Sequence, residues 1–319
     1  MKQTVLVTGA NGFIGRALCV DIARRGFTVR AAVRKLSSAT GLPGEYVQIG
    51  DTGADADWSS ALAGVDAVVH LAARVHVMRD NALQPLAAFR AVNVVATERL
   101  ARAAAAQGVK RFVYVSSIKV NGEGTQPGQP YTPTDVPAPI DPYGKSKHEA
   151  EEALHWLANE SGLEVVIIRP VLVYGPGVKG NFLSMMQWLH KGIPLPLGSI
   201  NNQRSLVALG NLVDLIVTCL HHPKAPNQTF LISDGQDLST TELLRRTSAE
   251  LGRPARLIPV SALVLRTAAR LLGKAEYAER LCGSLQVDIS KTRELLGWVP
   301  PVGVDEALKQ TARHFLANL

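Results

Sequence analysis

Tyr143 and Lys147, four residues apart, are the pair whose types and spacing most directly suggest chemistry. In a helix they lie on one face. A free tyrosine, with a pKa of about 10, is a poor base at neutral pH. A neighbouring ammonium and the N-terminus of a helix both favour its phenolate. The pair therefore predicts proton transfer at an alcohol or carbonyl oxygen during hydride exchange with a nicotinamide, and Lys147 is also expected to hold the cofactor ribose.

The residues just before this pair are suited to start a helix, because Asp141 is a good N-cap and Pro142 fits the first helical position. Two serines, Ser116 and Ser117, follow the apolar run Arg111–Val115, which has the composition of a buried strand. Doubly wound sheets bind ligands at the carboxyl ends of their strands. We predict that Ser117 polarises the substrate oxygen beside the tyrosine. Ser116 is the alternative for this role, and a serine that only caps a turn is the alternative without chemistry.

Glycines recur at every third position directly after the first apolar run, Thr4–Val7. Gly9 permits a tight turn, Gly12 lets the backbone approach a pyrophosphate, and Gly15 allows the next helix to pack closely on the sheet. The N-terminus of that helix presents N–H groups and the positive end of its dipole to the phosphates. The residues predicted to form this dinucleotide site are Gly9, Asn11, Gly12, Phe13, Ile14 and Gly15.

The end of the expected strand Thr28–Val33 bears on the choice of cofactor. Arg34 and Lys35 follow it, in place of the carboxylate that would hold a ribose 2′-hydroxyl. A cation there binds a 2′-phosphate, so NAD(P) is expected with NADP(H) favoured over NAD(H); a solvated loop is the alternative. Asp51, after the third strand, is expected to contact adenine, with a surface aspartate as the alternative. Small or apolar residues expected against the cofactor after the fourth strand are Leu71, Ala72 and Ala73.

The elements that must position these residues alternate short apolar strands with longer amphipathic stretches. The expected strands are Thr4–Val7, Thr28–Val33, Tyr46–Ile49, Ala67–Leu71, Arg111–Val115 and Glu164–Ile168. The expected helices begin at about Ile14 and cover Ala87–Gln107 and Tyr143–Ser161. Strands that are buried on both faces become nearly continuous apolar runs. The fold class predicted from this rhythm is α/β, with a Rossmann-type doubly wound parallel sheet.

The texture of the sequence changes after about Gly175, where glycines and prolines interrupt shorter elements. Helices are expected at Leu183–His190, Thr240–Leu251, Ala262–Leu271 and Val304–Leu316. We therefore predict an NAD(P)-binding Rossmann domain over 1–175 and a smaller C-terminal substrate domain over 176–319. Strands near Ser205–Val207 and Phe230–Ser233 leave open whether segments in 205–235 return to the first sheet.

Composition narrows the classes of function. The chain has 319 residues, 46% of them hydrophobic, which fits a packed globular protein and excludes disordered and collagen-like architectures. The 3 cysteines lie far apart, and with no signal-peptide pattern and no membrane-length apolar run they indicate a cytoplasmic protein without membrane insertion. The histidines lack metal-ligand spacing, so no metal is expected. The net charge of +7 comes from scattered cations, which favours a small anionic substrate over nucleic acid.

Together these motifs resemble the extended short-chain dehydrogenase/reductases, particularly their nucleotide-sugar epimerase/dehydratase group. The segments that carry the resemblance are Thr8–Gly15, His70–Ala73, Asn93, Ser117, Tyr143 with Lys147, Arg169–Pro176 and Asp288–Trp298. The resemblance implies a Ser117-Tyr143-Lys147 catalytic set, cofactor contacts at Asn93 and Pro170, and a UDP-sugar substrate. It also implies a homodimer built from two helices of each subunit, here Ala87–Gln107 and Tyr143–Ser161.

The resemblance also indicates the reaction, which is hydride exchange at a sugar carbon, usually C4. Dehydratases of the family carry an Asp-Glu pair after the catalytic serine or threonine; here Ile118 and Lys119 stand there, which disfavours elimination. Lys119 is expected to face the substrate together with Ser117. Asn121 replaces a tyrosine that is usual in the family, so the local sugar contacts are expected to differ there.

The stretch Gly175–Leu209 looks most like bacterial enzymes of surface-polysaccharide sugar synthesis, among them reductases of UDP-4-keto-6-deoxy-N-acetylhexosamines. In these, Asn181 and Arg204 match positions that contact the nucleotide diphosphate, although a surface salt bridge is the alternative for Arg204. Such a 4-ketoreductase is the main prediction, and a UDP-hexose 4-epimerase acting on glucose or N-acetylglucosamine is the alternative. A non-catalytic NADP-binding sensor and a reductase of carbonyl compounds unrelated to sugars stay open.

Overall fold

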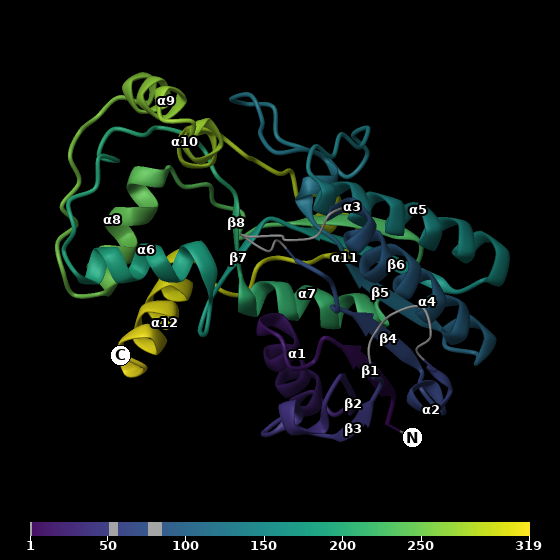
Figure 1. The fold of residues 1–319 in the computed structure, drawn as a ribbon. Coiled ribbons are helices and arrows are strands. Elements are labelled where there is room, and N and C mark those ends of the chain that lie inside the picture. The colour runs from purple at the N-terminus through teal and green to yellow at the C-terminus, as the bar shows by residue number, and fades with distance from the viewer. Residues whose placement is uncertain (1, 51–56, 76–84) are drawn as a thin grey trace.

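A seven-stranded parallel sheet organises the protein, shown in Figure 1 as a computed structural model that describes residues 2–50, 57–75 and 85–319. Its strands are β1 (Thr4–Thr8), β2 (Thr28–Val33), β3 (Glu45–Gln48), β4 (Ala67–His70), β5 (Arg111–Val115), β6 (Glu164–Pro170) and β9 (Gln228–Ile232). Their order in the sheet is β3-β2-β1-β4-β5-β6-β9. The order reverses between β1 and β4, which is where doubly wound sheets bind their ligands. The predicted fold class is confirmed.

Helices cover both faces of this sheet, as in a three-layer α/β fold. The helices that pack on it are α1 (Phe13–Arg24), α2 (Ser59–Leu62), α4 (Ala96–Ala106), α5 (Pro142–Ser161), α7 (Leu209–His221) and α11 (Ser290–Leu296). Alternation along β1 separates the two layers. Val5 and Val7 face the core with α1 and α7, whereas Leu6 faces the core with α4 and α5.

The helix α7 was not predicted from the sequence. Most of its residues are buried, because it lies against α1 on one side and the sheet on the other. A short, nearly continuous apolar run cannot be assigned to a helix or a strand by periodicity alone. Between Leu212 and Leu220 only Asp214 and Thr218 interrupt the apolar residues, so the composition of this run fits a buried strand as well as a helix.

The helix predicted over Ala87–Gln107 is divided into three parts. An α-helix, α3 (Pro85–Arg90), is followed by a π-helical turn at Ala91–Val95 and then by α4. Single π turns inside α-helices are rare and often occur at functional sites. This turn carries Asn93, which is buried.

A smaller lobe follows the end of β6. Its elements are β7 (Leu172–Tyr174), α6 (Gly180–His190), β8 (Leu206–Ala208), α8 (Thr240–Glu250), α9 (Ala262–Leu271), α10 (Ala275–Cys282) and α12 (Val304–Ala317). The strands β7 and β8 pair with each other, whereas β9 returns to the main sheet beside β6. The chain thus crosses between the two parts several times, which anchors the smaller lobe to the sheet (Figure 1).

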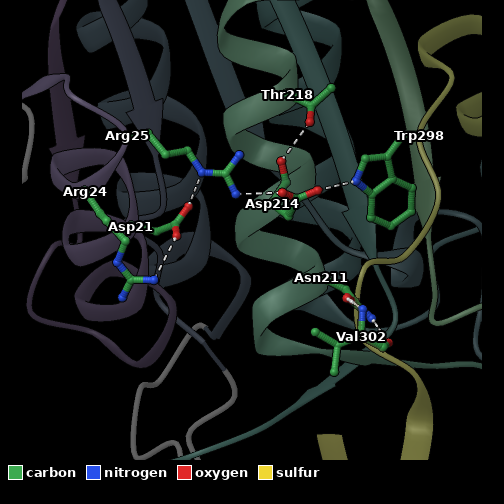
Figure 2. A network of polar contacts seen from close by, with 8 residues as sticks. All are labelled: Asp21, Arg24, Arg25, Asn211, Asp214, Thr218, Trp298 and Val302. Atoms are coloured by element: carbon green, nitrogen blue, oxygen red, sulfur yellow. Dashed lines mark hydrogen bonds and ion pairs between the residues drawn. The ribbon is translucent and has the colours of Figure 1, made fainter. Parts of the chain in front are cut away.

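A polar network links α1 to α7 and to Trp298, in the segment between α11 and α12 (Figure 2). The carboxylate of Asp214, on α7, accepts hydrogen bonds from Arg25 at the end of α1 (2.6 Å) and from the indole Nε1 of Trp298 (2.8 Å). Trp298 is buried, as expected for a core residue. Because α1 begins at the glycine loop, this network holds the helix of the predicted dinucleotide site in place.

Candidate active site

The glycine loop has the backbone geometry that a diphosphate requires. Gly9 follows β1 with φ of +65°, a left-handed conformation that favours glycine. Gly12 is the N-cap of α1 and provides no side-chain cap, so the N–H groups of the first turn stay available to a ligand. Asn11 and Gly12 are exposed, whereas Phe13 and Ile14 are partly buried. The residues present fit the diphosphate of a dinucleotide.

Gly15 is where the helix comes closest to this loop. A Cβ atom at this position would lie 2.2 Å from the carbonyl oxygen of Gly9 and 2.7 Å from Cα of Ala10. Both neighbours are backbone atoms, so α1 would have to move to admit a side chain. Close packing at the third glycine of the motif is therefore a property of the structure as well as a prediction from the sequence.

Gly15→Ala is expected to weaken NAD binding by about tenfold or more, because overpacking against backbone displaces the helix N-terminus from the phosphates. The dissociation constant is measured by calorimetric titration with NAD. Gly210→Ala is the matched control, since a Cβ at Gly210 in α7 would meet only Val302, at 3.9 Å. Equal affinities of the two variants would contradict the assignment of the loop.

A buried hydrogen-bond chain connects the glycine loop to the end of β4. Oγ1 of Thr8 lies 2.7 Å from Nδ1 of His70, and Nε2 of His70 lies 2.9 Å from Oγ1 of Thr97 on α4. The backbone N–H of Ala72 donates to Oγ1 of Thr8 (3.2 Å). Burial lowers the pKa of His70 to about 3, so its imidazole is neutral and serves as a bridge between the two hydroxyls. The backbone of Leu71 and Ala72 is thereby placed beside Gly9. Contact of Leu71, Ala72 and Ala73 with the cofactor stays a prediction.

Asn93 connects the loop after β4 to the helix α5. Its Oδ1 accepts from the N–H of Arg74 (2.8 Å), and its Nδ2 donates to the carbonyl of Arg74 (3.0 Å) and to Oγ of Ser146 (3.0 Å). The side chain therefore pins the loop after β4 against α5, directly beside Lys147. We assign this positioning to Asn93; direct contact with the cofactor stays a prediction.

The catalytic helix α5 begins as its sequence indicated. Asp141 is the N-cap, and its Oδ1 accepts from the N–H of Gly144 (2.6 Å). Tyr143 lies in the first turn, and Ser117 follows the carboxyl end of β5, where its Oγ accepts from the N–H of Lys119 (3.2 Å). The Ser117 side chain lies near enough to Tyr143 to lower the pKa of its hydroxyl, although 26 positions separate the two residues in the chain.

The pKa of Tyr143 is raised to about 12, chiefly because its hydroxyl is removed from water and also because of the nearby charge of Asp141. The side chain of Ser117 acts in the opposite direction. Without cofactor, Tyr143 is therefore a neutral acid at physiological pH. It can donate a proton to an oxygen, and it needs a cation beside it to accept one.

Lys147, the cation predicted for this role, is buried one turn further along α5. Its Nζ donates to the carbonyl of Val115 (2.8 Å) and lies 4.1 Å from the centre of the Tyr114 ring. Burial lowers its pKa to about 7, whereas the carboxylate of Glu151 raises it. A lysine near its titration point in a buried site is typical of functional centres.

A buried ion pair behind the catalytic residues was missed by sequence reasoning. Glu151 lies one turn after Lys147 on α5, and its carboxylate receives Nε of Arg169, on β6, at 3.0 and 3.2 Å and Nη2 at 2.5 Å. Nη1 of Arg169 donates to Oδ1 of Asn121 (2.9 Å), whose Nδ2 donates to the carbonyl of Thr132 (2.9 Å). The sequence signal that could have indicated this pair is the glutamate four residues after Lys147. Asn121 thus belongs to this network.

Other predicted residues lie at separate places around the site. Nζ of Lys119 forms ion pairs with Asp141 and, at 3.1 Å, with Glu123, so its charge is already partnered inside the protein. Arg34 is exposed just after β2, and Pro170 is buried at the end of β6. The prediction for Asp51 lies outside the described residues.

The two residues predicted for the diphosphate lie in the smaller lobe. Asn181 is exposed in the first turn of α6. Arg204 is partly buried before β8, and its Nη1 donates to the carbonyls of Arg280 (3.0 Å) and Gly283 (3.1 Å). Among the described residues, the guanidinium is held by these two carbonyls and forms no salt bridge. Its removal from water lowers its pKa.

The described part of the chain contains no group of three or more His, Cys, Asp or Glu side chains that could hold a metal ion. In the same residues, no helix is long and apolar enough to cross a membrane. The cysteines Cys19, Cys219 and Cys282 are buried and unpaired by disulfides.

Known proteins resemble this chain in sequence and in fold. Residues 5–233 match the model of the NAD dependent epimerase/dehydratase family. The chain is 49% identical to a UDP-glucose 4-epimerase of Vibrio cholerae over 318 residues, 99% of this chain and 96% of the relative. It shares the fold of the UDP-glucuronic acid 4-epimerase of Bacillus cereus in complex with NAD (TM-score 0.80, 20% identity, 99% of both chains). It is also similar to MoeE5 in complex with UDP-glucuronic acid and NAD (TM-score 0.77, 26% identity, 99% of this chain and 100% of the other).

Proposed function

The chain belongs to the NAD dependent epimerase/dehydratase family, and from that premise we propose that it is a 4-epimerase of UDP-glucose or a closely related UDP-hexose. The observation that carries the proposal is the position of buried Lys147, one turn after Tyr143 on α5, whose Nζ donates to the carbonyl of Val115 at the carboxyl end of β5. The glycine loop follows β1 at the same end of this parallel sheet. The Vibrio cholerae relative, named UDP-glucose 4-epimerase, supports the same reaction. This choice puts the epimerase ahead of the 4-ketoreductase that the sequence favoured.

The surroundings of the catalytic residues support hydride exchange over elimination. Loss of water from a sugar needs an additional acid and base near the reacting carbons. Ile118 is buried, and Lys119 is paired with Asp141 and Glu123. Neither side chain provides a carboxyl group at the positions where the dehydratases have one.

The chain's own residues account for the proton steps of an epimerisation. When bound, NAD supplies the hydride acceptor and donor for the sugar carbon. Tyr143, as phenolate, takes the proton of the sugar hydroxyl and later returns it. The ammonium of Lys147 stabilises that phenolate, and its charged form is favoured by Glu151. Ser117 donates a hydrogen bond to the reacting oxygen and keeps it aligned with Tyr143.

We assign the diphosphate of the substrate to Arg204 and Asn181. A guanidinium binds phosphate oxygens through two parallel hydrogen bonds. The carbonyls of Arg280 and Gly283 fix Nη1 of Arg204, so the remaining donors have a set direction. Pre-orientation of this kind lowers the entropy that binding would otherwise cost.

The test is conversion of UDP-glucose to UDP-galactose by purified protein without added cofactor, followed by separation of the two sugars by chromatography. An epimerase restores its cofactor in each cycle, so we expect turnover with no net change in absorbance at the reduced-nicotinamide band. Tyr143→Phe should be inactive in the same assay. Absence of product from UDP-glucose, UDP-galactose and their N-acetyl forms would reject the proposal.

One observation favours the 4-ketoreductase as a second candidate. Arg34 is exposed at the end of β2, where a cation suits the 2′-phosphate of NADPH and where no carboxylate follows the strand. A reductase would oxidise NADPH in proportion to a UDP-4-keto-6-deoxy-hexosamine and would not interconvert UDP-hexoses. The two assays therefore separate the candidates.

A further inference from the structure

The helix α9 turns its apolar side toward solvent. None of its residues is buried, and Leu263 and Leu271 have 74% and 84% of their surface exposed. These two leucines are eight residues apart, two turns of helix, so they lie on one face, and Val264 lies beside them. On an ordinary surface helix this face would carry polar side chains.

The helix is held in place from its other side. Ala262 and Leu265 pack on the core of the smaller lobe, and Oγ of Ser261 caps the first turn by accepting from the N–H of Val264 (3.4 Å). In Figure 1, α9 and α10 lie at the outer edge of the smaller lobe, away from the main sheet. The apolar face is thus presented by an ordered element, and it is wide enough to need a partner.

Charge around this face is net positive. Residues 251–275 contain five cations, Arg253, Arg256, Arg266, Arg270 and Lys274, and no Asp or Glu. Glu250 precedes this segment at the end of α8, and Glu276 and Glu279 follow it on α10, where they form ion pairs with Arg280 and Arg266. An apolar stripe bordered by lysine and arginine is the pattern of helices that lie in the interface of a membrane.

We propose that α9, with the loop before it, docks on the surface of a bilayer that contains anionic phospholipids. The exposed leucines would enter the boundary between headgroups and acyl chains, and Arg270 and Lys274 would meet the lipid phosphates. A second copy of this chain is a poorer partner, because a two-fold contact would bring identical cationic surfaces together. A nucleic acid would satisfy the charge and leave the leucines in water.

Docking would reach the substrate lobe through a short path. The carbonyls of Arg280 and Gly283, at the end of α10, accept from Arg204, and the carbonyl of Leu281 accepts from Thr240 (2.7 Å). The pair of helices α9 and α10 therefore borders Arg204, one of the residues that we assign to the diphosphate. Docking depends only on the exposed residues of α9 and of the loop before it, whichever sugar the enzyme converts.

The test is flotation of the full-length protein with vesicles of equal parts phosphatidylglycerol and phosphatidylcholine, compared with vesicles of phosphatidylcholine alone. We expect the protein to float with the anionic vesicles and to be released by high salt, because salt screens the charge term. The double variant L263Q/L271Q is expected to lower the bound fraction relative to free protein by about tenfold, since the apolar contacts are lost. R270Q/K274Q should weaken binding to anionic vesicles as well.

Two matched controls isolate this face. V299Q/L319Q removes two exposed apolar side chains elsewhere, and R99Q/R313Q removes two exposed cations elsewhere. Both should float like the wild type, and all variants should convert UDP-hexose in solution as the wild type does. Failure of the wild type to float, or equal flotation of L263Q/L271Q, overturns the proposal. Loss of a dimer in light scattering for L263Q/L271Q, with flotation unchanged, would assign the face to a second copy instead.

Discussion

Replacement of Tyr143 by phenylalanine is expected to lower kcat by about 10²–10⁴-fold, the range that a positioned general acid or base contributes. The change removes the hydroxyl that we propose exchanges a proton with the sugar, and it leaves the ring, which lies 6.1 Å from the ring of Phe89, in its place. The measurement is turnover of UDP-hexose at saturating substrate. Because the glycine loop and Lys147 are untouched, affinity for NAD should stay within about twofold of the wild type.

Tyr46→Phe is the matched control for this variant. Tyr46 lies on the edge strand β3, and its hydroxyl donates to the carbonyl of Leu42, away from the catalytic residues. The control should keep full turnover. A positioned general acid or base usually contributes a factor of about 10² or more to kcat. If the kcat of Tyr143→Phe is within about tenfold of the control, Tyr143 does not carry the proton step.

Removal of the carboxylate of Glu151 is expected to cost about 3–5 kcal/mol of the free energy of unfolding, because it leaves a buried charge on Arg169 without its counter-ion. Both side chains are almost wholly buried, at 2% and 6% exposure, so solvent cannot replace the lost partner. The measurement is urea unfolding of Glu151→Ala at neutral pH. A cost of this size approaches the whole stability of many domains, so low yield of folded protein is also an expected result.

Glu160→Ala is the matched control, since Glu160 is exposed on the same helix. Its unfolding free energy should differ from the wild type by about 0.5 kcal/mol or less. Glu151→Gln keeps a hydrogen-bond acceptor for Arg169 and should fall between the two. Equal stabilities for Glu151→Ala and Glu160→Ala would show that the buried pair contributes nothing net to the fold.

These two predictions concern different tasks of one helix. Tyr143 and Lys147 occupy the turns of α5 that face the candidate site, and Glu151 occupies the next turn, where it joins α5 to β6 through Arg169. Loss of Tyr143 should affect chemistry with little change in stability. Loss of Glu151 should affect stability first, which makes the pair of variants informative about both.

The amino-acid sequence by itself was sufficient for the parts of the site that are local in the chain. The spacing of Gly9, Gly12 and Gly15, the Asp141 cap and the pair Tyr143 and Lys147 each depend on residues a few positions apart. Turn geometry, capping and helical periodicity are set by such neighbours, and the structure has them where they were predicted. The doubly wound parallel sheet also followed, because alternating strands and helices leave few ways to wind a parallel sheet.

Only the tertiary structure determined which residues that are far apart in the chain contact one another. The sequence did not indicate that Arg169 would face Glu151 and Asn121, that Nη1 of Arg204 would be held by the carbonyls after α10, or that α7 would be buried on nearly every side. Each of these depends on which elements meet, and burial and hydrogen-bond partners are properties of that meeting. The exposed face of α9 belongs with them, because its apolar period predicted a helix equally well for a core position and for a surface that awaits a partner.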